Sequence, residues 1–361
     1  MKTTLIISGI ILLIACTGAA VLSHPAFGLY RHRQTDRLRQ SANWRDGMFR
    51  NQQPTPQFTG DKKMLHAMWS MLTDRSSKRV PEEAVPAVLT DLHSLPCDSN
   101  LAVWFGHSSY MFFLGGKRFL ADPVLKQEFP SSVMMKAFKG SDIYSPDQLP
   151  DIDYLIITHE HWDHLDYPTL RELRGRVGHV FCPLGIAAYL TYWGYEPERI
   201  TEMDWYESSG DAEGCPRVTC LPTRHFSNRL FARNRTLWAS FMVEFAGGKV
   251  YLGGDGGYDG RFADIYSRFG SVDLAFLENG QYDANWRYIH TMPADLEKAI
   301  CDLRAKQVFT VHHGKFALAM HPWSEPDTVA QSIAARDGIK LLDAPIGAVV
   351  KYTCGEDKLA K

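Results

Sequence analysis

The feature that most constrains this chain is a short apolar run followed at once by a cluster of histidines. Residues 154–157 have the sequence YLII, which is typical of a buried β-strand, and residues 158–164 continue as THEHWDH. In an extended segment, side chains two positions apart point the same way, so His159 and His161 can reach one metal ion. After a turn, Asp163 and His164 can reach a second site nearby. A lone histidine is usually a core or surface residue, but four candidate ligands at this spacing predict a metal centre.

Three later apolar runs also end in a residue that can bind metal. The runs at 218–221, 250–252 and 308–311 lead to His225, Asp255 and His312. Glycines on both sides of Asp255 would let the backbone approach closely. Imidazole nitrogens and carboxylate oxygens suit zinc, or iron or manganese where carboxylates dominate. The repetition of this plan predicts that residues far apart in the sequence converge on a site for two divalent ions.

From residue 101 onward, short apolar runs alternate with helical patterns, which predicts packed β-sheets covered by helices. The predicted strands are 101–105, 110–114, 118–121, 154–157, 180–182, 218–221, 237–245, 250–252, 274–277, 308–311 and 348–352. The predicted helices are 168–174, 186–193 and 293–306. Residues 23–100 are polar and poorly periodic. We therefore expect three parts: a membrane anchor or signal segment at 1–22, an extension at 23–100 that packs on or links to the catalytic domain, and the catalytic domain at 101–355.

The run THEHWDHLD at 158–166 resembles the signature of the metallo-β-lactamase superfamily, whose α/β fold is a four-layer αββα sandwich. Four further stretches resemble the branch that contains N-acyl-phosphatidylethanolamine-hydrolysing phospholipase D and its bacterial relatives: GHSS at 106–109, LADP at 120–123, LGGDGGY at 252–258 and VHHGKFAL at 311–318. The resemblance covers about residues 101–352. The segments HPAFG at 24–28 and NWRDG at 43–47 are similar to those of bacterial members with an N-terminal membrane segment.

The resemblance assigns the metal ligands residue by residue. It implies His159, His161 and His225 for the first ion, Asp163, His164 and His312 for the second, and Asp255 as the bridge between them. His313 is the alternative to His312, because His313 stands where the family has another large residue. His290 matches a family histidine that lies near the metals without binding them. Asp122 resembles an acidic residue that orients the ligand loop.

The activity implied by the resemblance is that of a hydrolase that uses two divalent ions, with zinc expected and manganese or iron as alternatives, to activate water. We expect Asp163, Asp255 and His290 to be catalytic: the carboxylates fix the metals and orient the nucleophile, and His290 binds a substrate oxygen or assists the leaving group. The expected reaction is that of a phospholipase D-type phosphodiesterase on N-acyl-phosphatidylethanolamine-like lipids. A lactonase, a thioesterase and a membrane-tethered scaffold without activity remain alternatives, because one fold hosts many reactions.

The N-terminus carries the most apolar stretch of the chain, at residues 5–22. As a helix it would reach about 27 Å, just enough to cross a bilayer core. It is either a retained bacterial inner-membrane anchor, a signal peptide cut near Ala19 or Ala20, or a lipoprotein leader with Cys16 acylated. Arginines at 31, 33, 37 and 39 favour a cytoplasmic flank. We expect membrane attachment with the catalytic domain on the periplasmic side. The cytoplasmic side remains the alternative.

The charge balance argues against a nucleic acid as partner. The chain has 39 Lys and Arg residues against 41 Asp and Glu residues, a formal net charge of −2, whereas nucleic-acid binding relies on a basic surface. The expected partner is instead a membrane lipid or another phosphodiester. Arg224, Arg229, Arg233 and Arg235 surround His225 in the sequence. They either steer a phosphate group or form a solvated charged loop.

Overall fold

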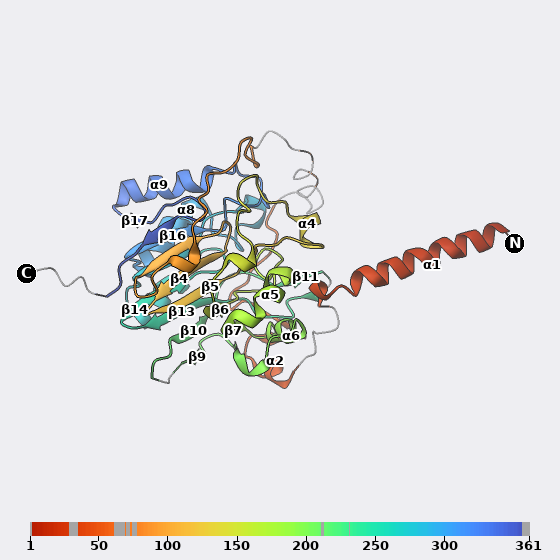
Figure 1. Ribbon diagram of the computed structural model, residues 1–361, viewed down its shortest axis with the longest axis horizontal. Helices are drawn as coiled ribbons and strands as arrows, with labels where there is room; N and C mark the ends of the chain where they lie inside the picture. Colours follow the sequence, from red (N-terminus) through yellow and green to blue (C-terminus); the bar gives the residue numbers. More distant parts are fainter. Residues whose placement is uncertain are drawn as a thin grey trace, which may run out of the picture.

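The computed structural model describes residues 2–28, 35–60, 69, 73, 78–210, 213–230 and 232–355. Its centre is a pair of seven-stranded β-sheets that pack face to face (Figure 1). Phe112 and Phe119 from one sheet and Phe241 from the other belong to the apolar core between them. The rings of Tyr110 and Phe276 stack across this interface with centroids 3.9 Å apart. The main core therefore lies between the sheets.

The first sheet has the strand order β18-β3-β4-β5-β6-β7-β8. Its strands are β3 (Leu101–Trp104), β4 (Tyr110–Leu114), β5 (Lys117–Ala121), β6 (Ile152–Ile156), β7 (Val177–Pro183), β8 (Ile200–Met203) and β18 (Val349–Lys351). Strands β5 to β8 pair in parallel, so their carboxyl ends meet at one edge. That edge carries Asp122 after β5 and the histidine-rich loop after β6.

The second sheet has the strand order β17-β16-β15-β14-β13-β10-β9. Its strands are β9 (Ser208–Ser209), β10 (Arg217–Leu221), β13 (Ser240–Phe245), β14 (Gly248–Leu252), β15 (Leu274–Glu278), β16 (Gln307–Val311) and β17 (Lys340–Leu341). Strands β14 to β17 are parallel, and β13 runs antiparallel to both β10 and β14. Strand β10 therefore points the same way as β14, and the residues that follow β10, β14, β15 and β16 share one edge.

Helices cover the outer face of each sheet, which confirms the expected four-layer αββα arrangement. Helices α5 (Tyr167–Leu173) and α6 (Ala187–Tyr192) bury Leu170 and Leu190 against the first sheet. Helices α7 (Arg261–Phe269), α8 (Pro293–Leu303) and α9 (Glu325–Asp337) bury Phe262, Leu296 and Ile333 against the second. The ranges 168–174, 186–193 and 293–306 were predicted as helices, and α5, α6 and α8 confirm them.

The start of α5 shows how local sequence fixes an element beside the histidine-rich loop. Asp166 precedes the helix, and its carboxylate accepts a hydrogen bond from the Thr169 N–H at 3.3 Å. Pro168 follows in the first turn, where its missing N–H costs nothing. The loop that began at the end of β6 therefore ends at a capped helix.

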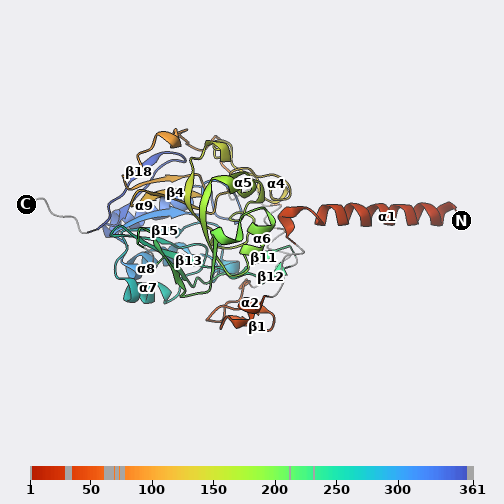
Figure 2. The same cartoon turned by 60° about the horizontal axis from the view of Figure 1, so that its bottom comes forward.

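Helix α1 (Lys2–Leu22) extends away from the body of the molecule in both overall views (Figures 1 and 2). Within the described part of the chain, no helix is found that is both long and apolar enough to cross a membrane. The membrane segment expected at 1–22 is therefore not confirmed. Several side chains of α1 lie outside the described residues.

The remaining short elements lie in connecting segments. They are α2 (Asp36–Gln40), β1 (Trp44–Arg45), β2 (Met48–Phe49), α4 (Ser131–Met134), β11 (Asn228–Arg229) and β12 (Ala232–Arg233). The described parts of 23–100 lie against the sandwich: Asn51 Nδ2 donates to the His225 carbonyl at 2.7 Å, and Val85 N donates to the Lys139 carbonyl at 2.8 Å. The division of the chain at residue 100 stays a prediction.

Candidate metal centre

The loop after β6 is held by a carboxylate at the end of β5. The Thr158 N–H donates to Asp122 Oδ1 at 2.8 Å, and the Thr158 hydroxyl donates to Asp122 Oδ2 at 2.6 Å. His164 Nδ1 lies 2.8 Å from the same Oδ2. Because Nδ1 is engaged in this way, the ring of His164 is fixed and its Nε2 is left for the centre. Asp122 therefore occupies the orienting position that its place in the sequence indicated.

His159, His161, His225 and Asp255 form a first cluster, in which one ligand atom of each lies within 4.8 Å of all the others. His159 Nε2 and His225 Nε2 lie 2.8 and 3.1 Å from His161 Nδ1. Asp255 Oδ2 is 3.8 Å from His159 Nε2 and from His225 Nε2. The ligand atoms of a tetrahedral ion with bonds of 2.0–2.1 Å lie about 3.3 Å apart. The spacing of the cluster fits one divalent ion.

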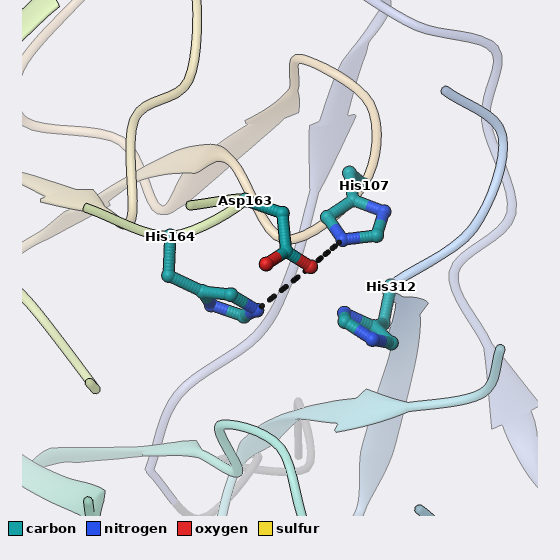
Figure 3. Close-up of side chains that lie close together, drawn as sticks. All are labelled: His107, Asp163, His164 and His312. Carbon is teal, nitrogen blue, oxygen red and sulfur yellow. Dashed lines mark hydrogen bonds and ion pairs between the residues drawn. The ribbon is translucent and has the colours of Figure 1, made fainter. Parts of the chain in front are cut away.

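Asp163, His164 and His312 form a second cluster, which also includes His107 (Figure 3). His107 Nε2 and His164 Nε2 lie 2.8 and 3.6 Å from Asp163 Oδ2. Asp255 reaches this cluster too, with Oδ2 at 3.3 Å from His164 Nε2 and Oδ1 at 3.2 Å from His312 Nδ1. Asp255 thus faces both clusters, as a bridging ligand requires.

Among the described residues, four buried polar atoms at this centre have no hydrogen-bond partner: His107 Nδ1, His164 Nε2, His312 Nε2 and Asp255 Oδ1. Buried polar groups are almost always paired, because leaving them unpaired costs the full desolvation penalty. Cations between the two clusters would satisfy the last three of these atoms. The residues present therefore fit a pair of divalent ions.

Burial and neighbouring charges together set the protonation of the candidate ligands. Burial, reinforced by the neighbouring imidazoles, lowers the pKa of His159 far below its usual value, and burial lowers the pKa of His161 to about 3. Neutral imidazole is the form that binds metal. Burial raises the pKa of Asp255 to about 6, with the nearby Glu278 adding to the rise. For Asp163, burial favours a raised pKa, but His164 and His107 hold the pKa below its usual range.

Glu278, at the end of β15, is a buried acid that our reading of the sequence missed. Its Oε1 contacts His290 Nδ1, and its Oε2 accepts from the N–H groups of Gly256 and Thr291 at 2.8 and 3.2 Å. Burial would lower the pKa of His290, but the Glu278 carboxylate raises it. The ring of His290 stacks on that of His312 with centroids 5.3 Å apart. Glu278 follows the same pattern of a strand that ends in a metal-competent residue, and that signal could have found it.

The structure separates His312 from the neighbouring alternative His313. His312 lies in two of the three His/Asp/Glu groups found among the described residues. His313 packs against Trp104, with ring centroids 4.9 Å apart, and its Nδ1 lies 3.4 Å from Asp327 Oδ1. The left-handed backbone of His312, with φ of 71°, accompanies this change of direction. Of the two, His312 lies at the centre.

A cavity of about 450 Å³ opens onto the two clusters. His161, Asp163, Asp255, His290 and His312 lie on its surface. Its other lining residues are Gln57, Phe58, Phe226, Asn228, Arg233, Gln281, Trp286, Ile289 and Leu318. The part played by Gln57 and Phe58, from the N-terminal extension, has no signal in the sequence, because nothing local marks a distant segment as a pocket wall.

The four arginines near His225 have different environments. Arg233 lines the cavity and is exposed. Arg224 and Arg235 donate to backbone carbonyls of the N-terminal extension, those of Pro54 and Gly47. Arg229 is fully buried. Neither a shared phosphate-steering role nor a solvated loop therefore describes the whole set.

Comparison with known proteins shows which family this chain resembles in sequence and fold. Residues 117–313 match the model of the beta-lactamase superfamily domain. An uncharacterized protein of Mycobacterium tuberculosis is 36% identical over 80% of this chain and 78% of its own length. N-acyl-phosphatidylethanolamine-hydrolyzing phospholipase D 1 of Caenorhabditis elegans is 28% identical over 73% of this chain and 79% of its own length. The isothiocyanate hydrolase from Delia radicum gut bacteria, a solved structure, has a TM-score of 0.57 and 16% identity over 70% of this chain and 100% of its own.

These matches agree with what the structure shows. The domain model covers the histidine-rich loop and extends to His313, and the solved relative shares the fold. Buried His/Asp clusters consistent with a dinuclear site lie at the edge where the strands of both sheets end. The chain belongs to the metallo-β-lactamase superfamily, and it carries the His/Asp metal clusters of that superfamily's metal-dependent hydrolases.

Proposed function

We propose that this protein is a phosphodiesterase of phospholipase D type that hydrolyses N-acyl-phosphatidylethanolamine-like lipids. The observation that carries the proposal is the combination of surfaces in one cavity: two His/Asp clusters, apolar side chains and a cation. The relative from Caenorhabditis elegans, named for this activity, supports the same substrate class.

The cavity suits a phosphodiester that carries apolar groups. Phe58, Phe226, Trp286 and Leu318 give it apolar walls, which can contact acyl or glyceride carbons. Among the described lining residues, Arg233 is the one Lys or Arg. A guanidinium matches the geometry of a phosphate group. The guanidinium attracts the negative charge of a phosphodiester, whereas a neutral lactone or thioester carries no such charge. The phosphodiester is therefore favoured over the alternative substrates.

The chain's own residues have distinct parts in such a reaction. Two divalent ions, when bound, would supply water activation and stabilisation of charge on the phosphoryl oxygens. Asp163 and Asp255 would hold these ions and orient the attacking water. Glu278 holds His290 through Nδ1, which leaves Nε2 of His290 to contact the oxygen of the leaving group. Water attacks phosphorus, the bond from phosphorus to the ethanolamine oxygen breaks, and that oxygen takes up a proton.

Zinc is the metal we propose for both clusters, with manganese and iron as alternatives. Histidine nitrogens dominate the first cluster, which favours zinc. The carboxylates of Asp163 and Asp255 also suit the alternatives. Elemental analysis of the purified protein distinguishes the three: we expect about two zinc ions per chain.

The test of the substrate uses the full-length protein, loaded with zinc, and vesicles that contain N-acyl-phosphatidylethanolamine. We expect phosphatidic acid and N-acylethanolamine as products, measured by mass spectrometry. Phosphatidylethanolamine without the N-acyl chain, a lactone panel and a thioester serve as matched substrates. Turnover of lactones or thioesters alone would overturn the proposal. A protein that binds no metal and turns over none of these substrates would support the scaffold instead.

Attachment to a bacterial membrane, with the catalytic domain on the periplasmic side, stays a prediction from the sequence of residues 1–22. Fractionation of cells that express the full chain tests it, with a carbonate wash to separate anchored from peripheral protein. Recovery in the washed membrane fraction is the expected result, and full release into the wash would exclude an anchor.

A further inference from the structure

Arg229 is a cation buried beside the histidine-rich loop, and the reaction proposed above does not use it. It lies in β11, and its side chain is fully buried. Its guanidinium lies over the ring of Trp162, 3.7 Å from the centroid. Burying a guanidinium costs free energy unless its donors are satisfied. The partners of its Nε and Nη1 therefore indicate why it is there, whereas its Nη2 has no hydrogen-bond partner among the described residues.

Those partners are backbone carbonyls at both ends of one loop. Arg229 Nη1 donates to the Glu160 carbonyl at 2.7 Å and to the Leu165 carbonyl at 3.1 Å. The residues between these two carbonyls include His161, Asp163 and His164, three of the candidate ligands. A single nitrogen that binds both carbonyls fixes the distance across the loop. Since side-chain directions follow the backbone, it also limits where those three side chains can point.

The third partner comes from the segment that follows α1. Arg229 Nε donates to the Ala26 carbonyl at 2.7 Å. Next to Ala26, Phe27 is buried and its ring packs edge-on against Trp162, with centroids 5.6 Å apart. On the other side, the Pro25 carbonyl accepts from Trp193 Nε1 at 3.1 Å. Residues 24–28 therefore pack against the histidine-rich loop, through Arg229 and the ring of Trp162.

Gly28 shows how closely this segment fits. Its φ of +61° lies in the left-handed region, and a Cβ there would lie 2.1 Å from Cε1 of the buried Tyr189. A glycine is needed at this position for both reasons. In Figures 1 and 2, the β11–β12 hairpin lies beside the base of α1, which agrees with these contacts.

We infer that Arg229 is a positioning residue for the metal loop, and that residues 24–28 complete the clamp it forms. We call this set the loop clamp: Arg229 with the carbonyls of Ala26, Glu160 and Leu165. The inference rests on the proposed use of His161, Asp163 and His164 as ligands, but not on the identity of the substrate. The segment that joins the N-terminal helix to the domain is thus part of the catalytic unit.

The experiment compares zinc affinity and loop protection in the full-length protein and four variants, three at arginines and Gly28→Ala. Arg229→Met removes every donor and keeps an apolar contact with Trp162, whereas Arg229→Lys keeps the charge but cannot reproduce the planar fork. Arg235→Met is the matched control, because Arg235 also donates to a carbonyl of the N-terminal extension, that of Gly47 at 2.9 Å. Within the described part of the chain, Arg235 makes no hydrogen bond or ion pair with the loop at 159–166. Zinc affinity is measured by chelator competition, and amide exchange of residues 159–166 is measured in the metal-free protein.

We expect the zinc dissociation constant to rise about 10- to 100-fold in Arg229→Met and by less in Arg229→Lys, as for other residues that orient metal ligands. Exchange of 159–166 should be faster in both, kcat should fall, and KM should stay unchanged. Arg235→Met should behave like the parent protein. Gly28→Ala, which disturbs the clamp from the other side, should shift zinc affinity in the same direction.

Parent-like zinc affinity and loop exchange in folded Arg229→Met or Arg229→Lys would overturn the inference. An equal effect of Arg235→Met would overturn it too, because the effect would then be general destabilisation. If Arg229→Met does not fold, Arg229→Lys decides. Failure of the parent protein to bind zinc would instead contradict the proposed function, so the two failures are distinguishable.

Discussion

The floor and the wall of the cavity are built on different principles. The floor consists of the two metal clusters, and its rings are held by buried partners such as Asp122 for His164 and the Ile289 carbonyl for His225. The wall residues Phe58, Arg233 and Trp286 lie outside the two large sheets; Phe58 and Trp286 are half-buried and Arg233 is exposed. The floor is part of the core, whereas the wall is carried by connecting segments.

This difference indicates that the floor determines the chemical step and the wall determines which substrate binds. A floor fixed by strand ends and buried hydrogen bonds can keep one geometry while the wall changes, and enzyme folds commonly vary function through loops on a rigid scaffold. We therefore expect floor substitutions to change metal binding and kcat, and wall substitutions to change KM. Four substitutions test this division.

Asp255→Asn should have the largest effect. It removes the charge that faces both clusters, and we expect kcat/KM to fall about 10³-fold or more, because metal ions supply several kcal/mol of transition-state stabilisation. Metal content, measured by elemental analysis, should fall from about two ions per chain. Unchanged turnover with full metal content would refute the bridging role.

His290→Gln should lower kcat about 10²-fold and leave metal content unchanged, because a positioned proton donor or acceptor contributes in this range. The exposed His93 provides a control, and His93→Gln should change nothing. Loss of metal in His290→Gln would show that His290 is a metal ligand. That result would contradict its assignment to the leaving group.

Asp122→Asn should weaken metal binding about 10- to 100-fold through the loop it orients, with a matching loss of activity at limiting metal. Asp153→Asn is the matched control at the far end of β6, where that carboxylate accepts from the Arg118 N–H at 2.9 Å. The comparison uses zinc titration against a chelator. Equal effects of the two variants would mean that any carboxylate on the β5–β6 pair matters, and that Asp122 gives the floor no special support.

Arg233→Gln should have the smallest effect. An exposed charge contributes about 1 kcal/mol, so we expect KM for a phosphodiester to rise about 5-fold with kcat unchanged. The rise should shrink at high salt, since salt screens exposed charges, and KM for a neutral ester should not change. A fall in kcat without a change in KM would contradict the assignment of Arg233 to the wall.

Local sequence was a sound guide wherever an apolar run led into a chemically distinctive residue. The run before His159 became β6, and Asp166 with Pro168 marked the start of α5. Helices α7 and α9 were not predicted: α7 buries only Phe262 and Ile265 as apolar residues, and α9 only Pro326, Ala330 and Ile333. Sparse apolar residues give α9 a weak periodic signal, and a helix of this kind depends on the sheet it covers. Helix α7, in contrast, is strongly amphipathic, so its apolar face could have been recognised from the sequence.

The sequence by itself determined the candidate ligands at the strand ends, because metal binding requires specific side chains and those are visible without a fold. Only the tertiary structure decided that Glu278 supports His290, that Phe58 closes the cavity, and that Arg229 is buried instead of facing a phosphate. Each of these depends on contacts between segments far apart in the chain. No local pattern encodes which distant carbonyl or ring will lie beside a given side chain, since that is fixed only when the two sheets and the N-terminal extension pack together.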